Sequence, residues 1–172
     1  MRRIVIGMAV VVGVGLTAVL PAASASAALT AGSIVCTVDV QYPHGSSHVS
    51  GTINEVSTVL CNEAVPRLSQ TTTLHKSGGG SWKGTLKVGY DTKLVQSNRA
   101  TSCSEAPGKF YGSAVTDVTW PVGYVGPTHN SLTGKTVSVT CSSASVAVKV
   151  PAGSNIKATT SGYSYTISAT HR

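Results

Sequence analysis

The sequence has few carboxylates, and this scarcity limits the chemistry that it can perform. Of its 172 residues 11% are charged, and only six are aspartate or glutamate. No two of these six are close in the sequence, and the chain has no Gly-x-Ser-x-Gly, His-Glu-x-x-His or phosphate-binding glycine motif. We therefore predict that the protein is not an enzyme and has no cofactor. Asp39, Glu55 and Asp117 fall in predicted strands, and we interpret them as solvent-facing residues.

Clustered positive charge is also missing. The net charge is +7, but beyond Arg2 and Arg3 no two basic residues are adjacent. Lys83 and Lys87 share one face of an alternating strand, which is the best sign of a polyanion site. The stacking aromatics expected of a protein that binds single-stranded nucleic acid do not accompany this charge. We predict no nucleic-acid partner and interpret the charge as a source of solubility.

The N-terminal segment has the composition of an export signal. Two arginines precede an apolar run over residues 4–20, and Ala25-Ser26-Ala27 is a small-residue cleavage site. The run is just long enough to span a membrane, so a retained anchor is the alternative, but its glycines and small-residue end favour cleavage. We predict a signal peptide over 1–27 and one secreted, extracellular domain over 28–172, with 145 residues, a net charge of +5 and no stable membrane insertion.

The four cysteines predict disulfide bonds. Large aromatic residues are scarce, with one Phe and two Trp, so the core needs further stabilisation. Cys36, Cys61, Cys103 and Cys141 are even in number in a chain that we expect to be exported, which favours disulfides. Four cysteines allow three pairings, of which we favour Cys61 with Cys103 and Cys36 with Cys141, nesting one loop inside the other. Their spacing lacks the paired ligands of a zinc site, and His44 and His48 lie in a Pro/Gly loop that sets no metal geometry.

After the predicted signal peptide the sequence shows short alternating runs of β-branched residues and no sustained helical periodicity. They predict an all-β fold, an antiparallel immunoglobulin-like sandwich with an additional C-terminal hairpin, and the alternative is a closed barrel. We expect a polar connection over 91–98 and a loop over 121–134. The expected strands are 34–40, 51–61, 68–76, 81–90, 100–103, 109–120, 137–141, 146–150, 155–160 and 163–170.

Two segments are candidate binding surfaces. Trp120 and Tyr124 flank Pro and Gly in a predicted loop, where they can hold a sugar or peptide or, as we favour, plug the open end of the sandwich. Val146, Val148 and Val150 alternate in a sheet edge that can add a strand to a partner. We therefore predict a non-enzymatic binding or adaptor module whose partner is another secreted protein, as in a structural subunit of an extracellular assembly of the antibacterial toxin type.

Two other functions remain as alternatives. A secreted protease inhibitor presents a loop held by a disulfide, and residues 62–67 and 104–109 follow cysteines in that way. An ordinary connection between strands is the simpler interpretation of both loops. A carbohydrate-binding or cell-wall-binding module would use Trp120 and Tyr124, with a cell-wall polymer as its partner.

Several strings together resemble a family of small secreted actinobacterial β-proteins of unassigned function. The resemblance covers residues 34–141 and implies a disulfide-bonded immunoglobulin-like domain without catalytic residues. The chain departs from the family pattern at Trp120, where Phe is more frequent, and in the segment after Cys141. The matching elements are Tyr42-Pro43-His44, Ser47-His48, Gly51-Thr52-Ile53-Asn54, Val59-Leu60-Cys61, residues 68–74, Cys103, residues 108–114, Trp120-Pro121-Val122-Gly123-Tyr124 and residues 137–141.

Overall fold

The protein is built almost entirely from antiparallel strands. The computed structural model describes residues 32–46, 48–141, 146–149 and 161–172, which excludes the predicted signal peptide and the predicted strand 155–160. Within these ranges the only helical element is the short 3-10 turn η1, Cys103–Glu105, and no helix is long and apolar enough to cross a membrane. The all-β prediction is confirmed. The strands are β1 Ile34–Gln41, β2 His44–Gly45, β3 Thr52–Lys76, β4 Ser81–Lys83, β5 Lys87–Ser102, β6 Gly108–Thr119, β7 Tyr124–Val125, β8 His129–Thr133, β9 Val137–Cys141, β10 Val146–Lys149 and β11 Ser161–His171.

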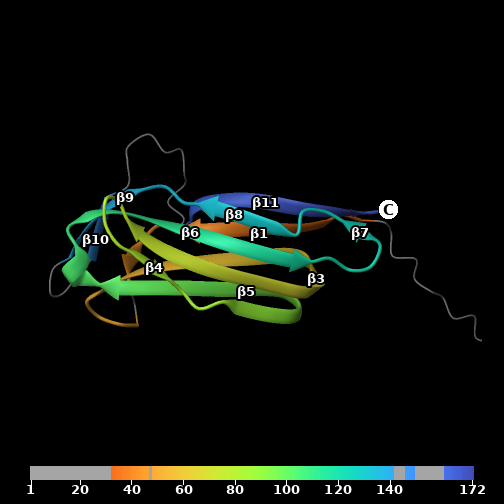
Figure 1. Ribbon diagram of the computed structural model, residues 1–172, viewed down its shortest axis with the longest axis horizontal. Helices are drawn as coiled ribbons and strands as arrows, with labels where there is room; N and C mark the ends of the chain where they lie inside the picture. The colour runs from red at the N-terminus through yellow and green to blue at the C-terminus, as the bar shows by residue number, and fades with distance from the viewer. Residues whose placement is uncertain (1–31, 47, 142–145, 150–160) are drawn as a thin grey trace, which may run out of the picture.

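These strands form one sheet that folds over on itself. Its main path runs β10-β9-β6-β3-β1-β11-β7, with β2, β4 and β5 paired to β3 and with β8 paired to β6. Figure 1 shows an elongated molecule with β9 and β10 at one end and β7, beside the C-terminus, at the other. The two ends are therefore far apart, which matters for the location of the candidate sites.

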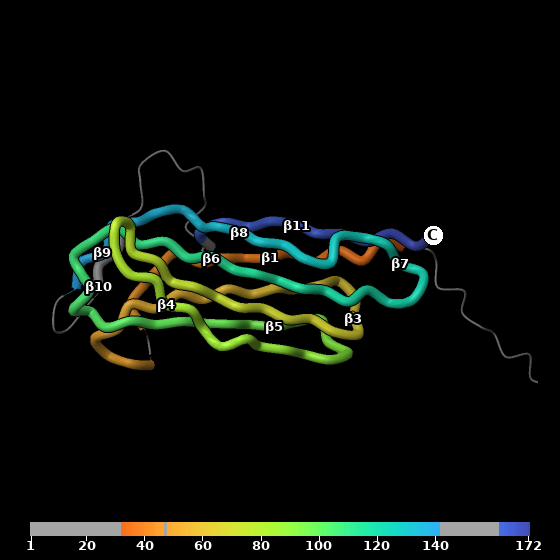
Figure 2. Tube along the Cα trace, in the orientation of Figure 1, coloured from red at the N-terminus to blue at the C-terminus, as the bar shows by residue number. Residues whose placement is uncertain are grey.

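The long strand β3 reverses direction near its middle. The Ser57 hydroxyl is hydrogen-bonded to the Thr72 hydroxyl, although fifteen residues separate them. A straight strand would place these side chains about 50 Å apart, since each residue advances about 3.3 Å. The pairing with β5 also shifts between Leu60 and Val65, and Figure 2 shows the chain turning back there. The first half of β3 pairs with β1 and the second half with β6, so β3 connects the two layers.

Strand β5 makes a matching reversal at Asp91. This residue has a φ of 46°, in the left-handed region that Asp tolerates better than most residues. A Cβ on Gly89 would lie 2.6 Å from Thr92 Cγ2 and 3.1 Å from Val95 Cγ2, so the chain on either side of the turn is in close contact. The predicted polar connection over 91–98 is therefore wrong. All of it belongs to β5, and Val95 and Ser97 are buried.

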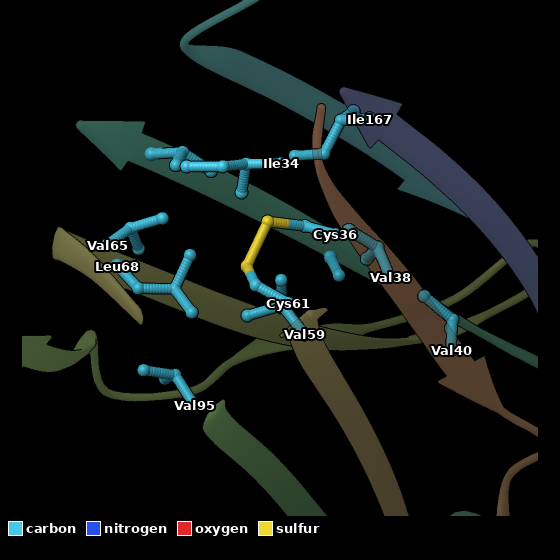
Figure 3. Packing of buried hydrophobic residues seen from close by; sticks show 12 residues of the cluster. Ile34, Cys36, Val38, Val40, Val59, Cys61, Val65, Leu68, Val95 and Ile167 are labelled. Atoms are coloured by element: carbon cyan, nitrogen blue, oxygen red, sulfur yellow. A yellow bond between two sulfur atoms is a disulfide. The ribbon is translucent and has the colours of Figure 1, made fainter. Parts of the chain in front are cut away.

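The interior contains two apolar clusters with a polar layer between them. The inner face of β3 passes from apolar Ile53 through Glu55 and Ser57 to apolar Val59, and its second half passes from Leu68 through polar residues to Leu74. Figure 3 shows the larger cluster, in which Val59 and Leu68 pack around a disulfide. Ser69 is equally buried, but it pairs with Val88 and Asp117 on the outer face of the sheet. The polar residues of the interior, all at most 1% exposed, are Glu55, Ser57, Gln70, Thr72, Ser97 and Thr116.

Most members of the polar layer are hydrogen-bonded to one another. The Thr72 amide donates to Ser97 Oγ at 3.1 Å. The Gln70 amide nitrogen, in the orientation that satisfies both groups, donates to the carbonyl oxygens of Ser57 at 3.1 Å and Val95 at 3.2 Å. These bonds offset the cost of removing polar groups from water, which is otherwise about 1–3 kcal/mol for each group.

The disulfide pairing that we favoured is wrong. Cys36 is bonded to Cys61 and Cys103 to Cys141. Cys36 and Cys61 are direct cross-strand partners in the β1–β3 ladder, with Cα atoms 3.9 Å apart, and both are buried in the larger cluster. A pairing between strands depends on their register, which the spacing of cysteines along the chain does not reveal.

The C-terminal strand is an integral part of the sheet. Strand β11 pairs with β1 from Gln41↔Ser161 to Ile34↔Ala169, and Ile167 is buried in the larger cluster. The predicted strand 163–170 is therefore confirmed as part of β11 in the main sheet, while the other half of the predicted C-terminal hairpin lies outside the described residues. The expected loop over 121–134 is also partly wrong, because it contains β7 and β8.

Candidate binding site

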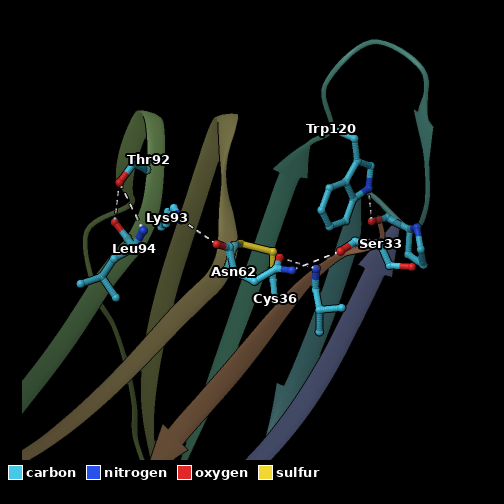
Figure 4. The surroundings of a disulfide bond; sticks show 10 residues. Ser33, Cys36, Asn62, Thr92, Lys93, Leu94 and Trp120 are labelled. Carbon is cyan, nitrogen blue, oxygen red and sulfur yellow. Dashed lines mark hydrogen bonds between the residues drawn. A yellow bond between two sulfur atoms is a disulfide. The ribbon is translucent and has the colours of Figure 1, made fainter. Parts of the chain in front are cut away.

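The connection between β6 and β8 is held tightly by Trp120. Its Nε1 donates to the Pro127 carbonyl at 3.0 Å, and the Val118 amide donates to the Thr128 carbonyl at 2.9 Å. The indole also packs against the larger apolar cluster. Figure 4 shows Trp120 near the end of the molecule that carries Cys36 and Asn62. One part of the side chain thus contributes to the core, as the plugging interpretation expects.

Tyr124 is fixed on the other side of the same connection. It belongs to β7, which pairs with the last residues of β11. Its ring meets the imidazole of His171 edge-on, with centroids 5.2 Å apart. The chain between Trp120 and Tyr124 turns at Gly123, which has a φ of 87° and leaves no room for a Cβ beside His171. Tyr124 is therefore held by the distant strand β11, and Trp120 by its own connection and by the larger apolar cluster.

Trp120 and Tyr124 line one cavity, which we call the Trp120 cavity. It has a volume of about 620 Å³ and opens to solvent at the end of β6. Val125 and Gly126 complete its apolar wall. The polar groups that line it are Arg67, Asp117, Thr119, Thr128 and His129. Apolar walls with a few convergent polar groups are typical of ligand sites.

Asp117 and His129 form the polar centre of this cavity. They are cross-strand partners in the β6–β8 ladder, and His129 Nδ1 lies 2.6 Å from Asp117 Oδ1. The other carboxylate oxygen, Oδ2, accepts a hydrogen bond from Ser69 Oγ at 3.4 Å. The Nδ1 of His129 is thus occupied by Asp117, and both oxygens of that carboxyl group have a partner. Both side chains are largely exposed, at 66% for His129 and 42% for Asp117, and so contribute little stability.

Arg67 connects this cavity with an exposed face of the sheet. It is a direct partner of Tyr90 on β5 and of Thr119 on β6, so the three side chains form one row. Val88 and Val115 belong to the next rows of the same face. We call the surface formed by Val88, Tyr90 and Val115 the Tyr90 face. Tyr90 is 71% exposed, and the two valines are 39% and 37% exposed.

The buried Glu55 is the residue that sequence reasoning placed most wrongly. We expected it on the solvent face, but it is fully buried, and neither carboxyl oxygen has a hydrogen-bond partner among the residues that the structure describes. Its carboxyl lies against Gly112 of β6, where any Cβ would overlap it. Burial raises the pKa of Glu55 from 4.5 to about 9, because the charged form loses its hydration. Glu55 is therefore neutral at pH 7, and it belongs to the polar layer rather than to the cavity.

The other predicted surface lies elsewhere. Val146 and Val148 are in β10, which pairs with β9 at the end of the molecule opposite β7 (Figure 1). Val150 lies outside the described residues. The two candidate surfaces that we predicted are therefore separate, and the cavity unites only Trp120 and Tyr124.

The two predicted inhibitor loops are short and anchored. Residues 62–67 form the reversal of β3, where Asn62 accepts a hydrogen bond from the Val35 amide at 2.8 Å and Lys93 Nζ lies 3.4 Å from Glu63 Oε2. Residues 104–109 include most of η1, beside the bond between Cys103 and Cys141. Both loops are thus bound to neighbouring strands.

Sequence reasoning missed Arg67, Asp117 and His129 as neighbours. The signal that would have found the last two is the alternation of residues 129–133, which makes β8 a hairpin partner of β6. Elsewhere, His44 Nδ1 lies 2.8 Å from the Tyr42 carbonyl oxygen, and no group of three or more metal-ligating side chains occurs in the described ranges.

Comparison of the chain with protein families, with curated proteins and with solved structures gave no match. The Trp120 cavity and the Tyr90 face are therefore interpreted from their own chemistry.

Proposed function

We propose that this protein is a secreted, non-enzymatic binding domain that holds another secreted protein on the Tyr90 face and in the adjoining Trp120 cavity. The observation that carries the proposal is the convergence of Arg67, Tyr90, Trp120 and Tyr124 on one region of the surface. Arg, Tyr and Trp are the residues most enriched at the energetic centres of protein interfaces.

The shape of the region also supports a protein partner. The Tyr90 face is the outer side of a sheet, and it adjoins a cavity through the row from Tyr90 to Thr119. Exposed apolar residues beside a pocket give a partner both contact area and an anchor point. Strand β10, which ends the strand order of the described residues, would offer a second and separate surface for strand addition.

The setting that we propose is extracellular. Both disulfides fit an oxidising compartment, where they persist. The proposed fold is an immunoglobulin-like sandwich, since the two halves of β3 belong to layers whose inner side chains meet. Membership of the actinobacterial family and a place in an antibacterial toxin assembly are parts of the same proposal.

The proposal is tested by truncating one aromatic side chain. Tagged wild-type protein, Tyr90→Ala and Leu94→Ala are purified from the culture supernatant of the native host, and co-purifying proteins are quantified by mass spectrometry. Leu94 is the matched control, because it is 52% exposed and pairs with Leu60, away from the Tyr90 face. We expect one partner that Tyr90→Ala loses at least tenfold and Leu94→Ala retains. A lone monomer from all three preparations would contradict the proposal.

A carbohydrate ligand is the second candidate, favoured by the aromatic and hydroxyl groups of the cavity. Sugars combine an apolar ring face with hydroxyl groups, which Trp120 and Thr128 would match. Pull-down on peptidoglycan, chitin and cellulose tests it. Protein that stays in solution with all three polymers would eliminate this candidate.

A further inference from the structure

The polar groups of the Trp120 cavity are not equally available to a ligand. Both carboxylate oxygens of Asp117 already accept hydrogen bonds, one from His129 and the other from Ser69. The Arg67 guanidinium, in contrast, forms no ion pair with any carboxylate in the described ranges. Arginine has five N–H donors in a planar arrangement. The cavity thus holds one positively charged donor group that the described chain leaves uncommitted.

The shape of this donor group favours a carboxylate. A guanidinium and a carboxylate are both planar, and they form two parallel charge-assisted hydrogen bonds. A phosphate dianion would carry more negative charge close to Asp117, whose own charge repels it. A carboxylate carries a single charge. The Trp120 and Val125 walls would contact an apolar group next to it.

The position of Arg67 indicates where the carboxylate comes from. Arg67 lies between Tyr90 on the exposed face and Thr119 at the mouth of the cavity. A chain that crosses the Tyr90 face would therefore reach Arg67 before it reaches Trp120. An isolated sugar in the cavity would have no use for that face.

We infer that the Trp120 cavity binds a carboxylate of a polypeptide partner, paired with Arg67, while a neighbouring apolar side chain rests against Trp120. The carboxylate belongs to an acidic side chain or to a chain terminus. This inference rests on the proposed function, because it names the group of the protein partner that the cavity recognises.

The test uses the two tryptophans as reporters. The ¹⁵N-labelled full mature chain gives one indole N–H signal from Trp120, in the cavity, and one from Trp82, which stacks on Phe110 with centroids 6.4 Å apart. Trp82→Phe assigns the signals. The probes are N-acetylphenylalanine, its uncharged amide, inorganic phosphate and glucuronate, each titrated to tens of millimolar. We expect N-acetylphenylalanine to shift the Trp120 signal and to leave the Trp82 signal in place.

Charge removal sharpens this test. Arg67→Gln should weaken binding of N-acetylphenylalanine at least tenfold, since a hydrogen bond to a charged group contributes about 1.5–3 kcal/mol. Arg99→Gln is the matched control, because Arg99 is exposed and does not line the cavity, and it should bind as the wild type does. An unchanged Trp82 signal in Arg67→Gln shows that the variant is folded.

Four results would overturn the inference. They are equal binding of the amide, undiminished binding by Arg67→Gln, tighter binding of phosphate or glucuronate than of N-acetylphenylalanine, and no shift of the Trp120 signal with any probe. The proposed function fails separately. If Tyr90→Ala retains the co-purified protein while the titration succeeds, the Tyr90 face is not the interface. If Arg67→Gln retains that protein while Tyr90→Ala loses it, only the carboxylate inference is wrong.

Discussion

The free energy of unfolding should depend on pH through the buried carboxyl of Glu55. Its pKa is about 9 in the folded chain against 4.5 for an unperturbed glutamate, so the folded state binds this proton more tightly than the unfolded state does. The contribution of Glu55 to stability is therefore greatest below pH 4.5 and falls as the pH rises to about 9. The loss is about 1.4 kcal/mol for each pH unit in that window. At pH 7 it amounts to roughly 3 kcal/mol.

Glu55→Gln removes the ionisation and keeps the shape of the neutral side chain. Relative to this variant, the wild type should lose roughly 4 kcal/mol of stability between pH 5 and pH 8. Urea unfolding followed by tryptophan fluorescence measures both curves. The pKa of His75 is lowered by burial and contributes a slope of opposite sign, but this slope is common to both proteins and cancels in the difference.

The test compares how steeply the free energy of unfolding changes with pH in the two proteins. A constant effect of the amide would shift the curve of the variant equally at every pH and would not change its slope. Glu63→Gln is the control. Glu63 is largely exposed beside Lys93, and its loss should leave the pH dependence of the wild type intact. Parallel curves for the wild type and Glu55→Gln would refute the reasoning, since they would mean that the carboxyl ionises in the folded protein without cost.

Three further predictions concern packing and the cross-links. Gly112→Ala should destabilise the fold by about 1–3 kcal/mol, because the new Cβ would overlap the Glu55 carboxyl. Glu55→Ala should relieve much of that cost when both substitutions are combined. Denaturant midpoints of the wild type, the two single variants and the double variant measure the coupling energy between the two positions. Replacing Cys36 and Cys61 by serine should cost about 3–4 kcal/mol, from the 25-residue separation of the bond, and thermal unfolding of the oxidised proteins checks it. Trp120→Phe should cost about 1 kcal/mol through its lost hydrogen bond, and calorimetry that finds no change would contradict this.

The alternation of residues predicted most strands, because period-two patterns record which side chains face an apolar interior. The pattern failed where the interior itself is polar. Residues 91–98 resembled a connection, yet Ser97 is buried and its hydroxyl accepts a hydrogen bond from the Thr72 amide. Glu55 was misplaced for the same reason. The alternation pattern alone does not show whether a polar residue in a strand faces solvent or a buried polar layer.

The candidate site could be predicted only in part. Trp120 and Tyr124 were recognisable because two aromatic residues enclose Pro121 and Gly123 in one short string. Their neighbours Asp117 and His129 come together through the register of β6 and β8, and Cys36 meets Cys61 through the register of β1 and β3. Register depends on pairing between distant segments, so it could not be derived from the residue pattern of this one sequence.

The pairing of β1 with β11 has a consequence for the order in which the chain is made. Ile34 lies opposite Ala169, so one of the first strands to emerge gains its outer neighbour from one of the last. Contacts between such distant segments form slowly, because the chain loses the entropy of closing a long loop before the stabilising contacts are made. A partly synthesised chain therefore keeps the edge of β1 unpaired and its layer incomplete.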